Sequence, residues 1–294
     1  MASRTGRVAT IALLALASLG LSWWLPWSGS ASTAHAHPPP FFWMSDLSPE
    51  RRVGFDLALG NSELGVDAVP ILAASVFGDI ALTDNLSLVG RVPFVYAQFT
   101  PLGNPEAESS ALALGNAGFG VKLVTLSDGG YSAMRYGLEG YIHLPTASDG
   151  DADDNFVALA ASSITVPDSG RYAIGATTAR LRGSARYEGR LAFLQAELGV
   201  DHFLTDGADD TTDLLLGLGV GIEFSPYVAL LGELTVITEL IDDDDDRDLL
   251  PSLDVGVRYH NPAWIVGARI HLPFAQEYRD GKVIAAFFDL SRRF

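Results

Sequence analysis

Long segments in which apolar residues alternate with small or polar ones limit the fold of this chain more than any other feature. Most of these segments exceed ten residues, whereas strands of soluble proteins average about five or six. A strand that crosses a bilayer at a tilt near 45° needs about 9–11 residues. We therefore predict an all-β fold, an antiparallel up-and-down transmembrane β-barrel of about twelve strands. The predicted strands are 53–60, 69–83, 86–99, 111–126, 131–146, 172–187, 190–204, 213–224, 227–240, 249–260, 263–274 and 282–294.

The two faces of each predicted strand differ in the way that a barrel wall requires. In 213–224, large apolar residues alternate with Gly217, Gly219, Gly221 and Glu223. A soluble β-sandwich also alternates, but its water-exposed face carries abundant charge, whereas these second faces carry mostly small residues. Small residues on an inner wall leave space for a lumen. Aromatic residues near strand ends are expected to form interfacial girdles: Phe94, Tyr96, Phe99, Tyr131, Phe203, Phe224, Tyr227, Tyr259, Trp264 and Phe274.

The predicted connections alternate in length. Tight turns at 83–85, 127–130, 187–189, 225–227 and 261–262 alternate with longer segments that are mostly acidic. Transmembrane barrels show this asymmetry, with short periplasmic turns and longer extracellular loops. If both ends of the barrel are periplasmic, the number of strands is even. We expect twelve strands, with fourteen as the alternative.

The segment 155–166 also alternates and has the pattern of a further strand. An odd strand would place every later loop on the wrong side of the membrane. We therefore assign this segment to the connection between the fifth and sixth predicted strands. There it extends above the membrane or folds into the lumen, and 147–171 would then be a constricting loop.

The N-terminal part of the chain is typical of an exported protein. Residues 1–36 are interpreted as a signal peptide, because Arg4 and Arg7 precede an apolar stretch and small residues stand at 34 and 36. The alternative is an uncleaved membrane anchor, since the apolar stretch continues through 22–27. The proline-rich segment 37–52 is interpreted as a periplasmic N-terminal arm, and 53–294 as the transmembrane barrel.

Composition and motifs disfavour several functions. The net charge of -17 argues against a nucleic-acid partner, and the absence of cysteine excludes disulfides and thiolate sites. The sequence has neither a G-x-S-x-G nor an H-E-x-x-H motif, so we expect no enzyme, no bound metal and no cofactor. The acidic stretch from Asp149 resembles the start of a calcium loop. However, Asp154 stands where that loop needs glycine and Ala160 where it needs glutamate.

Charged residues on the predicted inner faces are the candidate functional residues. Opposite charges on neighbouring strands can pair across the wall. One interpretation is a transverse field that orients polar solutes in a constriction; the other is a mutually neutralised interior that fills the barrel. The lumen-facing candidates are Arg135, Glu139, His143, Arg180, Arg182, Arg186, Glu197, Asp201, Glu233, Asp254, Arg258, Arg269 and His271.

The last predicted strand resembles the assembly signal of outer-membrane barrels. Phe288 and Leu290 lie on its apolar face, and Phe294 ends it with an aromatic residue. This resemblance implies recognition by the barrel-assembly machinery. The predicted location is the cell outer membrane, with membrane lipid and lipopolysaccharide as further partners.

Two stretches resemble a hairpin of porin-like outer-membrane proteins, some of which are transporters of aromatic-degradation pathways. They are "LGNAGFGVKL" at 114–123 and "YGLEGYIHLPTASDGD" at 136–151, about a tenth of the chain. The resemblance implies a passive or weakly selective channel for a small-molecule solute. The alternative function is a closed barrel with a structural or surface-interaction role and no transport.

Overall fold

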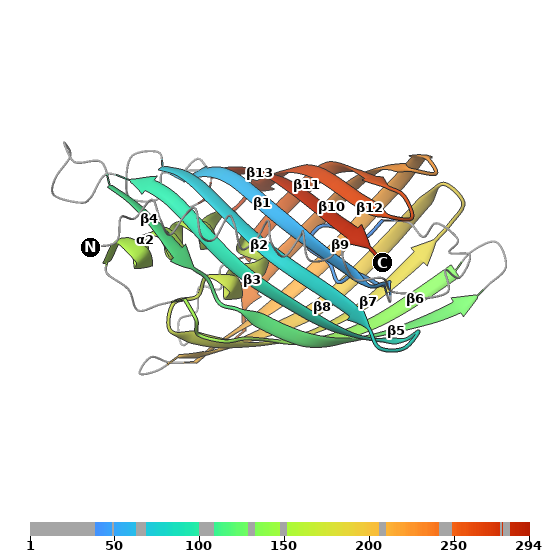
Figure 1. Cartoon of the computed structure of the whole chain (residues 1–294), viewed down its shortest axis with the longest axis horizontal. Helices are drawn as coiled ribbons and strands as arrows, with labels where there is room; N and C mark the ends of the chain where they lie inside the picture. The colour runs from blue at the N-terminus through green and yellow to red at the C-terminus, as the bar shows by residue number, and fades with distance from the viewer. Residues whose placement is uncertain are drawn as a thin grey trace.

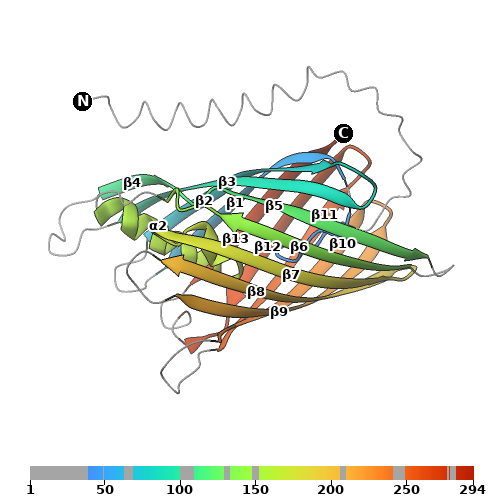
Figure 2. The same ribbon diagram turned by 90° about the horizontal axis from the view of Figure 1, so that it is seen from below.

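The structure is a computed structural model that describes residues 39–48, 50–62, 69–99, 109–128, 133–147, 152–205, 210–240, 249–276, 278 and 283–294. Its strands form one closed antiparallel ring (Figure 1; Figure 2). The strands are β1 (Arg52–Ser62), β2 (Val69–Ala81), β3 (Leu86–Phe99), β4 (Ser109–Leu114), β5 (Gly118–Asp128), β6 (Ala133–His143), β7 (Ala176–Glu188), β8 (Ala192–Thr205), β9 (Thr211–Ser225), β10 (Val228–Glu239), β11 (Leu249–His260), β12 (Trp264–Pro273) and β13 (Ile284–Arg293).

These strands occupy twelve positions in the barrel wall. β3 pairs with β4 through residues 94–99 and with β5 through residues 86–91, so β4 and β5 are two parts of one position. The ring closes because β1 pairs with β13 on one side and with β2 on the other. The prediction of an all-β, twelve-stranded up-and-down barrel is therefore confirmed. The predicted strand 111–126 exists as one wall position that is broken in its middle.

Asn116 lies at this break and is fully buried. Its side-chain amide donates hydrogen bonds to the carbonyl groups of Gly170, Ala173 and Ala176, at 3.0, 2.6 and 3.4 Å. Its side-chain oxygen accepts a hydrogen bond of 2.9 Å from the amide of Ala147. Buried backbone groups require such partners. One side chain thus satisfies the groups around the break and connects the wall to the segment before β7.

We expect Asn116→Ala to lower the free energy of unfolding by about 3 kcal/mol, because several buried backbone groups lose their partner at once. Denaturant titration of the protein folded in lipid vesicles measures the change. Asn85→Ala is the control, since Asn85 lies in an exposed turn and its side-chain amide donates only one hydrogen bond of 2.7 Å, to Val124. Equal effects of the two substitutions would contradict the role of Asn116.

The distribution of polar and apolar residues is inverted relative to a soluble protein. Large apolar side chains cover the outside, including Phe119 at 56% exposure, Leu218 at 61% and Phe224 at 69%, while many charged side chains are buried inside. A water-soluble monomer does not expose an apolar surface of this extent, so hydrocarbon surrounds the wall and the predicted outer-membrane location is confirmed. One girdle assignment was wrong: Phe203 is buried on the inner face, while Tyr131 lies outside the described residues.

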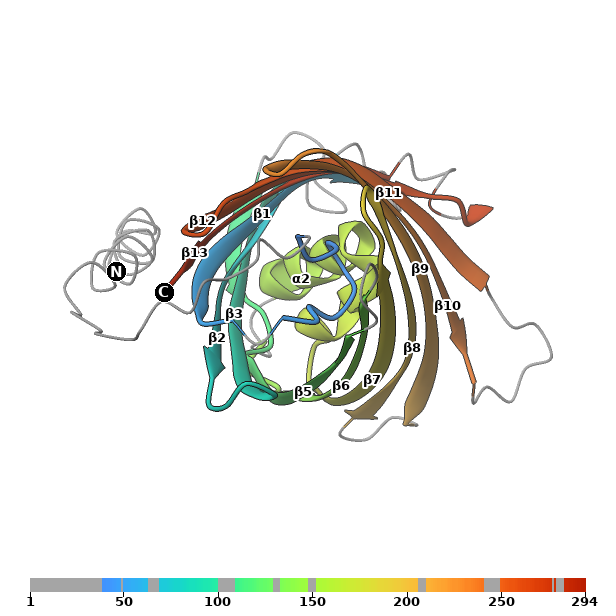
Figure 3. The same ribbon diagram turned by 90° about the vertical axis from the view of Figure 1, so that its right-hand side faces the viewer.

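The segment 155–166 lies in the connection between β6 and β7, as expected, and of the two arrangements considered it folds into the lumen; its strand-like pattern nevertheless forms helix in the described residues of this connection. It forms α2 (Ala152–Ile164), followed by the 3-10 helix η1 (Val166–Arg171). Figure 3, which looks along the barrel, shows α2 inside the ring of strands. The alternation misled because alanine and serine fill the positions between larger residues. Apolar residues in fact recur here every three or four positions, as on one face of a helix, at 156, 157, 160, 161 and 164.

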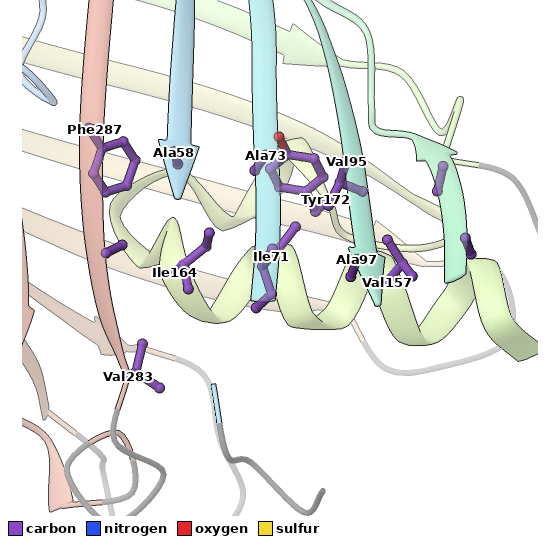
Figure 4. Close-up of a cluster of buried hydrophobic side chains, with 14 of the residues drawn as sticks. Ala58, Ile71, Ala73, Val95, Ala97, Val157, Ile164, Tyr172, Val283 and Phe287 are labelled. Atoms are coloured by element: carbon purple, nitrogen blue, oxygen red, sulfur yellow. The ribbon is translucent and has the colours of Figure 1, made fainter. Parts of the chain in front are cut away.

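α2 packs on a bed of small residues from the first strands of the wall. Ala58, Ala73 and Ala97 lie beneath Val157 and Ile164 (Figure 4). Small side chains let the helix approach the sheet closely. The helix therefore narrows the lumen on the side of β1 to β4.

Residues 39–48, which we call the plug segment, lie inside the barrel. Phe41, Trp43, Met44 and Leu47 are all buried, and Figure 3 shows the segment within the ring of strands. The interpretation of 37–52 as a periplasmic arm is thus corrected for residues 39–48. The physical reason is that consecutive large apolar side chains gain more from burial in the lumen than from exposure to water. The predicted signal peptide, 1–36, lies outside the described residues.

Candidate functional site in the barrel lumen

The glycine residues of the inner wall make room for the plug segment. A Cβ atom added at Gly219 would lie 2.6 Å from the ring of Phe41, and one at Gly217 would lie 2.9 Å from Met44. At Gly137 it would lie 2.2 Å from Leu47. We expected small inner residues to leave an open lumen. They instead hold side chains of the chain itself, because a glycine leaves a depression into which a large side chain fits.

Side chains of the wall bind the carbonyl groups of the plug segment. Arg186 donates to Pro39, Arg258 to Pro40 and Phe41, Arg182 to Trp43, Gln195 to Ser45, Arg135 to Leu47, and Lys122 to Ser48. These donors come from β5, β6, β7, β8 and β11. The plug segment therefore belongs to no sheet. Individual side chains hold its backbone, most of them charged.

Two wall carboxylates bind its amide groups. Glu233 accepts from the backbone N–H groups of Phe42 and Trp43, the second at 3.0 Å, and Glu197 accepts from Ser45 at 2.6 Å. Glu233 has no exposed surface. Buried backbone N–H groups need acceptors of this kind. The two carboxylates thus fix the middle of the plug segment across the lumen.

Trp43 of the plug segment is buried among charged side chains of the wall. Its indole N–H donates to Asp254 at 3.0 Å, and the guanidinium of Arg269 lies 3.9 Å from its ring centre. Asp254 also contacts Arg269 at 3.3 Å and His271 at 2.9 Å. The cation–π contact and the buried hydrogen bond together anchor the segment on β11 and β12.

A second charged group holds η1 inside the lumen. Asp168 contacts Arg180 at 2.5 Å, Arg91 at 3.3 Å and the neighbouring Arg171. Arg180 also pairs with Asp201 at 2.6 Å. Burial raises the pKa of Asp168, but the Arg180 guanidinium and its other cationic neighbours lower it more, to about 2. Asp168 is therefore an ionised carboxylate that joins η1 to β3 and β7.

Burial and neighbouring cations also act in opposite directions on the pKa of Asp46 in the plug segment. Asp46 pairs with Arg52 at 2.8 Å and accepts a hydrogen bond from Ser48. Burial raises the pKa of Asp46, but Arg52 and Lys122 lower it further, so the net shift is downward. The C-terminal end of the plug segment therefore remains charged at physiological pH.

The structure places all thirteen predicted residues on the inner face and divides them by role. Seven hold the plug segment: Arg135, Arg182, Arg186, Glu197, Glu233, Asp254 and Arg258. Arg269 and His271 surround Trp43 and Asp254, whereas Arg180, Asp201 and His143 belong to the group around Asp168. Glu139 lies on β6 opposite Lys122 of β5 and Arg182 of β7, and it lines the cavity described next.

A cavity of about 160 Å³ remains between the plug segment and the wall. Glu139, Tyr141 and Arg91 line it together with Phe42, Trp43 and Asp46 of the plug segment.

In the described residues no helix is long and apolar enough to span a membrane. The same residues contain no group of three or more side chains suited to hold a metal ion.

Sequence reasoning missed Asn116 and the residues of the plug segment. The signal for the plug segment was present, since Phe41, Phe42, Trp43 and Met44 are consecutive and would be unfavourable in an exposed arm. Asn116 had no comparable signal, because its partners lie 31 to 60 residues away in the sequence. Phe288, Leu290 and Phe294 face outward at 47%, 39% and 51% exposure, and their role in assembly stays a prediction.

Comparison with known proteins supports the fold. No protein-family model matches the chain, and no curated protein matches its sequence. Among solved structures, an outer membrane channel from Pseudomonas putida F1 is similar, with a TM-score of 0.59 and 11% identity over 88% of this chain and 100% of that one. The transport unit of the autotransporter AIDA-I from Escherichia coli gives 0.47, with 10% identity over 94% and 95%. The KdgM porin gives 0.44, with 8% identity over 82% and 99%.

The likeness to the Pseudomonas putida channel concerns the fold alone, and the inverted distribution of polar residues agrees with it. An apolar outer surface, a closed ring of tilted strands and a charged interior are what a bilayer-spanning barrel requires. The chain is an outer-membrane β-barrel.

Proposed function

We propose that this barrel is a channel for small polar solutes whose lumen is closed at rest by its own plug segment. The observation that carries the proposal is the way in which the plug segment is held. Its backbone binds to separate side chains rather than to a strand, so it can leave without disrupting the wall. A lumen lined by charged side chains would then be open to polar solutes.

Departure of the plug segment breaks none of the backbone hydrogen bonds between neighbouring strands of the wall. All hydrogen bonds of the ladder between β6, β7 and β8 lie within the ring, independent of the plug segment. The residues that would be released are mainly arginines and carboxylates, which water can solvate. The filled lumen also favours the rival function, a closed structural barrel, and one experiment separates the two.

A reversible covalent lock tests the proposal. The chain has no cysteine, so the pair Met44→Cys and Gly217→Cys introduces the only thiols. A Cβ atom at Gly217 lies 3.7 Å from Cγ of Met44, which is close enough for a disulfide with little backbone movement. The substitution of Met44 also removes the terminal methyl group that this Cβ would meet.

We expect the oxidised double variant to be silent in a planar bilayer and to show unitary currents after reduction. Each single-cysteine variant is a control and should conduct under both conditions. Equal currents before and after reduction would mean that ions pass beside the plug segment, and it would not be the gate. Silence under all conditions would favour the closed structural barrel.

A further inference from the structure

A hollow of about 530 Å³ opens on the outer surface of the barrel wall, which hydrocarbon surrounds. Its floor is formed by Gly78 of β2 and Gly90 of β3, which lie directly opposite each other in the register. A Cβ atom added at Gly78 would meet the carbonyl oxygen of Arg52 at 3.9 Å, and one at Gly90 would meet that of Gly118 at 3.8 Å. No closer contact exists at either position, so the surface above both glycines is open.

Large apolar side chains surround this floor. Val53 of β1 lies opposite Gly78, and Phe119 of β5 lies opposite Gly90, so these two residues bound the hollow on its flanks. The adjoining outward pairs along β2 and β3 form the other two sides, and they are Ile80 with Leu88 and Val76 with Val92. A hollow that is apolar on its floor and on all four sides suits a hydrocarbon chain.

The position of the hollow along the wall indicates which leaflet of the membrane it meets. Its end at Ile80 adjoins the short turn between β2 and β3, and short turns of such barrels face the periplasm. From Ile80 to Val76 the strand rises about 13 Å, whereas each half of the hydrocarbon core is about 15 Å thick. The hollow therefore lies in the periplasmic leaflet, which in an outer membrane consists of phospholipid rather than lipopolysaccharide.

A cation lies at the periplasmic end of the hollow. Arg51 is exposed, and its Nε donates a hydrogen bond of 3.2 Å to the carbonyl of Ala81, the residue after Ile80. It precedes Val53 by two residues, a distance of about 7 Å along the strand. Guanidinium groups bind phosphate through charge-assisted hydrogen bonds. A phosphate at Arg51 would thus place an acyl chain of the same lipid at the entrance of the hollow.

We propose that this hollow binds one phospholipid of the periplasmic leaflet, with an acyl chain over Gly78 and Gly90 and the phosphate at Arg51. A chain that fills the hollow makes contacts on its sides as well as beneath it, and such dispersion contacts add up. A flat part of the wall offers contacts from one side only. The site is independent of whether the barrel conducts.

Two substitutions test the two halves of the site. Gly90→Leu fills the hollow, and Arg51→Gln removes the charge at its end. Native mass spectrometry of the refolded protein, titrated with phosphatidylglycerol in detergent, counts the bound lipids. We expect the parent protein to bind one lipid before any others. Gly90→Leu should weaken this binding roughly tenfold, since about two methylene groups lose their contact, and Arg51→Gln roughly threefold, as for an exposed ion pair.

Gly183→Leu is the matched control. Gly183 also has open space above it, with no heavy atom within 4 Å of an added Cβ atom, but it lies between Leu138 and Leu198 of the neighbouring strands. We expect this variant to bind phosphatidylglycerol like the parent protein. Gly78→Leu fills the same hollow from β2 and should repeat the effect of Gly90→Leu, which keeps the test decisive if one variant does not refold.

Three outcomes would overturn the inference. Equal binding by Gly90→Leu, Gly78→Leu and Gly183→Leu would mean that only the general lipid shell is present. Tighter binding of lipopolysaccharide than of phosphatidylglycerol, lost in Gly90→Leu, would assign the hollow to the other leaflet. A dimer of the parent protein that Gly90→Leu dissociates would show that a second copy of the chain covers the hollow.

Discussion

Replacing residues 39–48 with a glycine-serine segment of equal length is expected to raise several-fold the fraction of time that a single channel conducts. The replacement retains the length of the chain but removes every side chain that fits the wall, including the anchor Trp43. The freed path runs along β7 to β12, since α2 remains packed on the opposite side of the lumen. Planar-bilayer recording of the refolded protein measures the change.

A wall substitution provides an independent approach to the same result. Gly219→Val leaves the plug segment intact but places a side chain where the ring of Phe41 lies, 2.6 Å from the new Cβ atom. We expect the fraction of time that a single channel conducts to rise, by less than in the glycine-serine variant. If both variants remain silent and are folded, α2 alone closes the lumen, and the plug segment is not what prevents passage.

The second large effect concerns the charged group around η1. Asp168→Asn should lower the free energy of unfolding by about 3 kcal/mol, because breaking a buried ion pair leaves uncompensated charge. Arg91 and Arg180 keep partial compensation from Asp56 and Asp201, which keeps the loss at the lower end of the usual range. Denaturant titration in lipid vesicles measures the change.

The control for this substitution is Ser162→Ala on α2. The hydroxyl group of Ser162 donates only to the carbonyl of Leu159 in its own helix, so its loss should cost under about 0.5 kcal/mol. Equal stability of Asp168→Asn and the parent protein would show that the arginines find other partners.

Acid should reproduce the effect of Asp168→Asn in the parent protein. The pKa of Asp168 is about 2 in the folded protein and 3.8 without its surroundings. Because the folded value is lower, the ionised carboxylate stabilises the fold above about pH 4, and this contribution is lost as the pH falls toward 2. The difference in stability between the parent protein and Asp168→Asn should therefore shrink across this range.

Strand-level features were predictable from local patterns. Length, two-residue periodicity and the alternation of short and long connections identified each wall position, because a strand that spans a bilayer must satisfy all three. The inner position of Arg135, Glu197 and Glu233 followed from the same periodicity. Local patterns could not assign partners to these residues, since they bind a segment 88 to 191 residues away.

A closed barrel with a charged interior and an apolar exterior follows from the strand patterns alone, because in hydrocarbon every backbone group of such strands needs a hydrogen-bond partner within the sheet. What occupies the interior is visible only in the folded molecule. Whether Gly217 and Gly219 border water or the side chains of Met44 and Phe41 depends on contacts between distant segments.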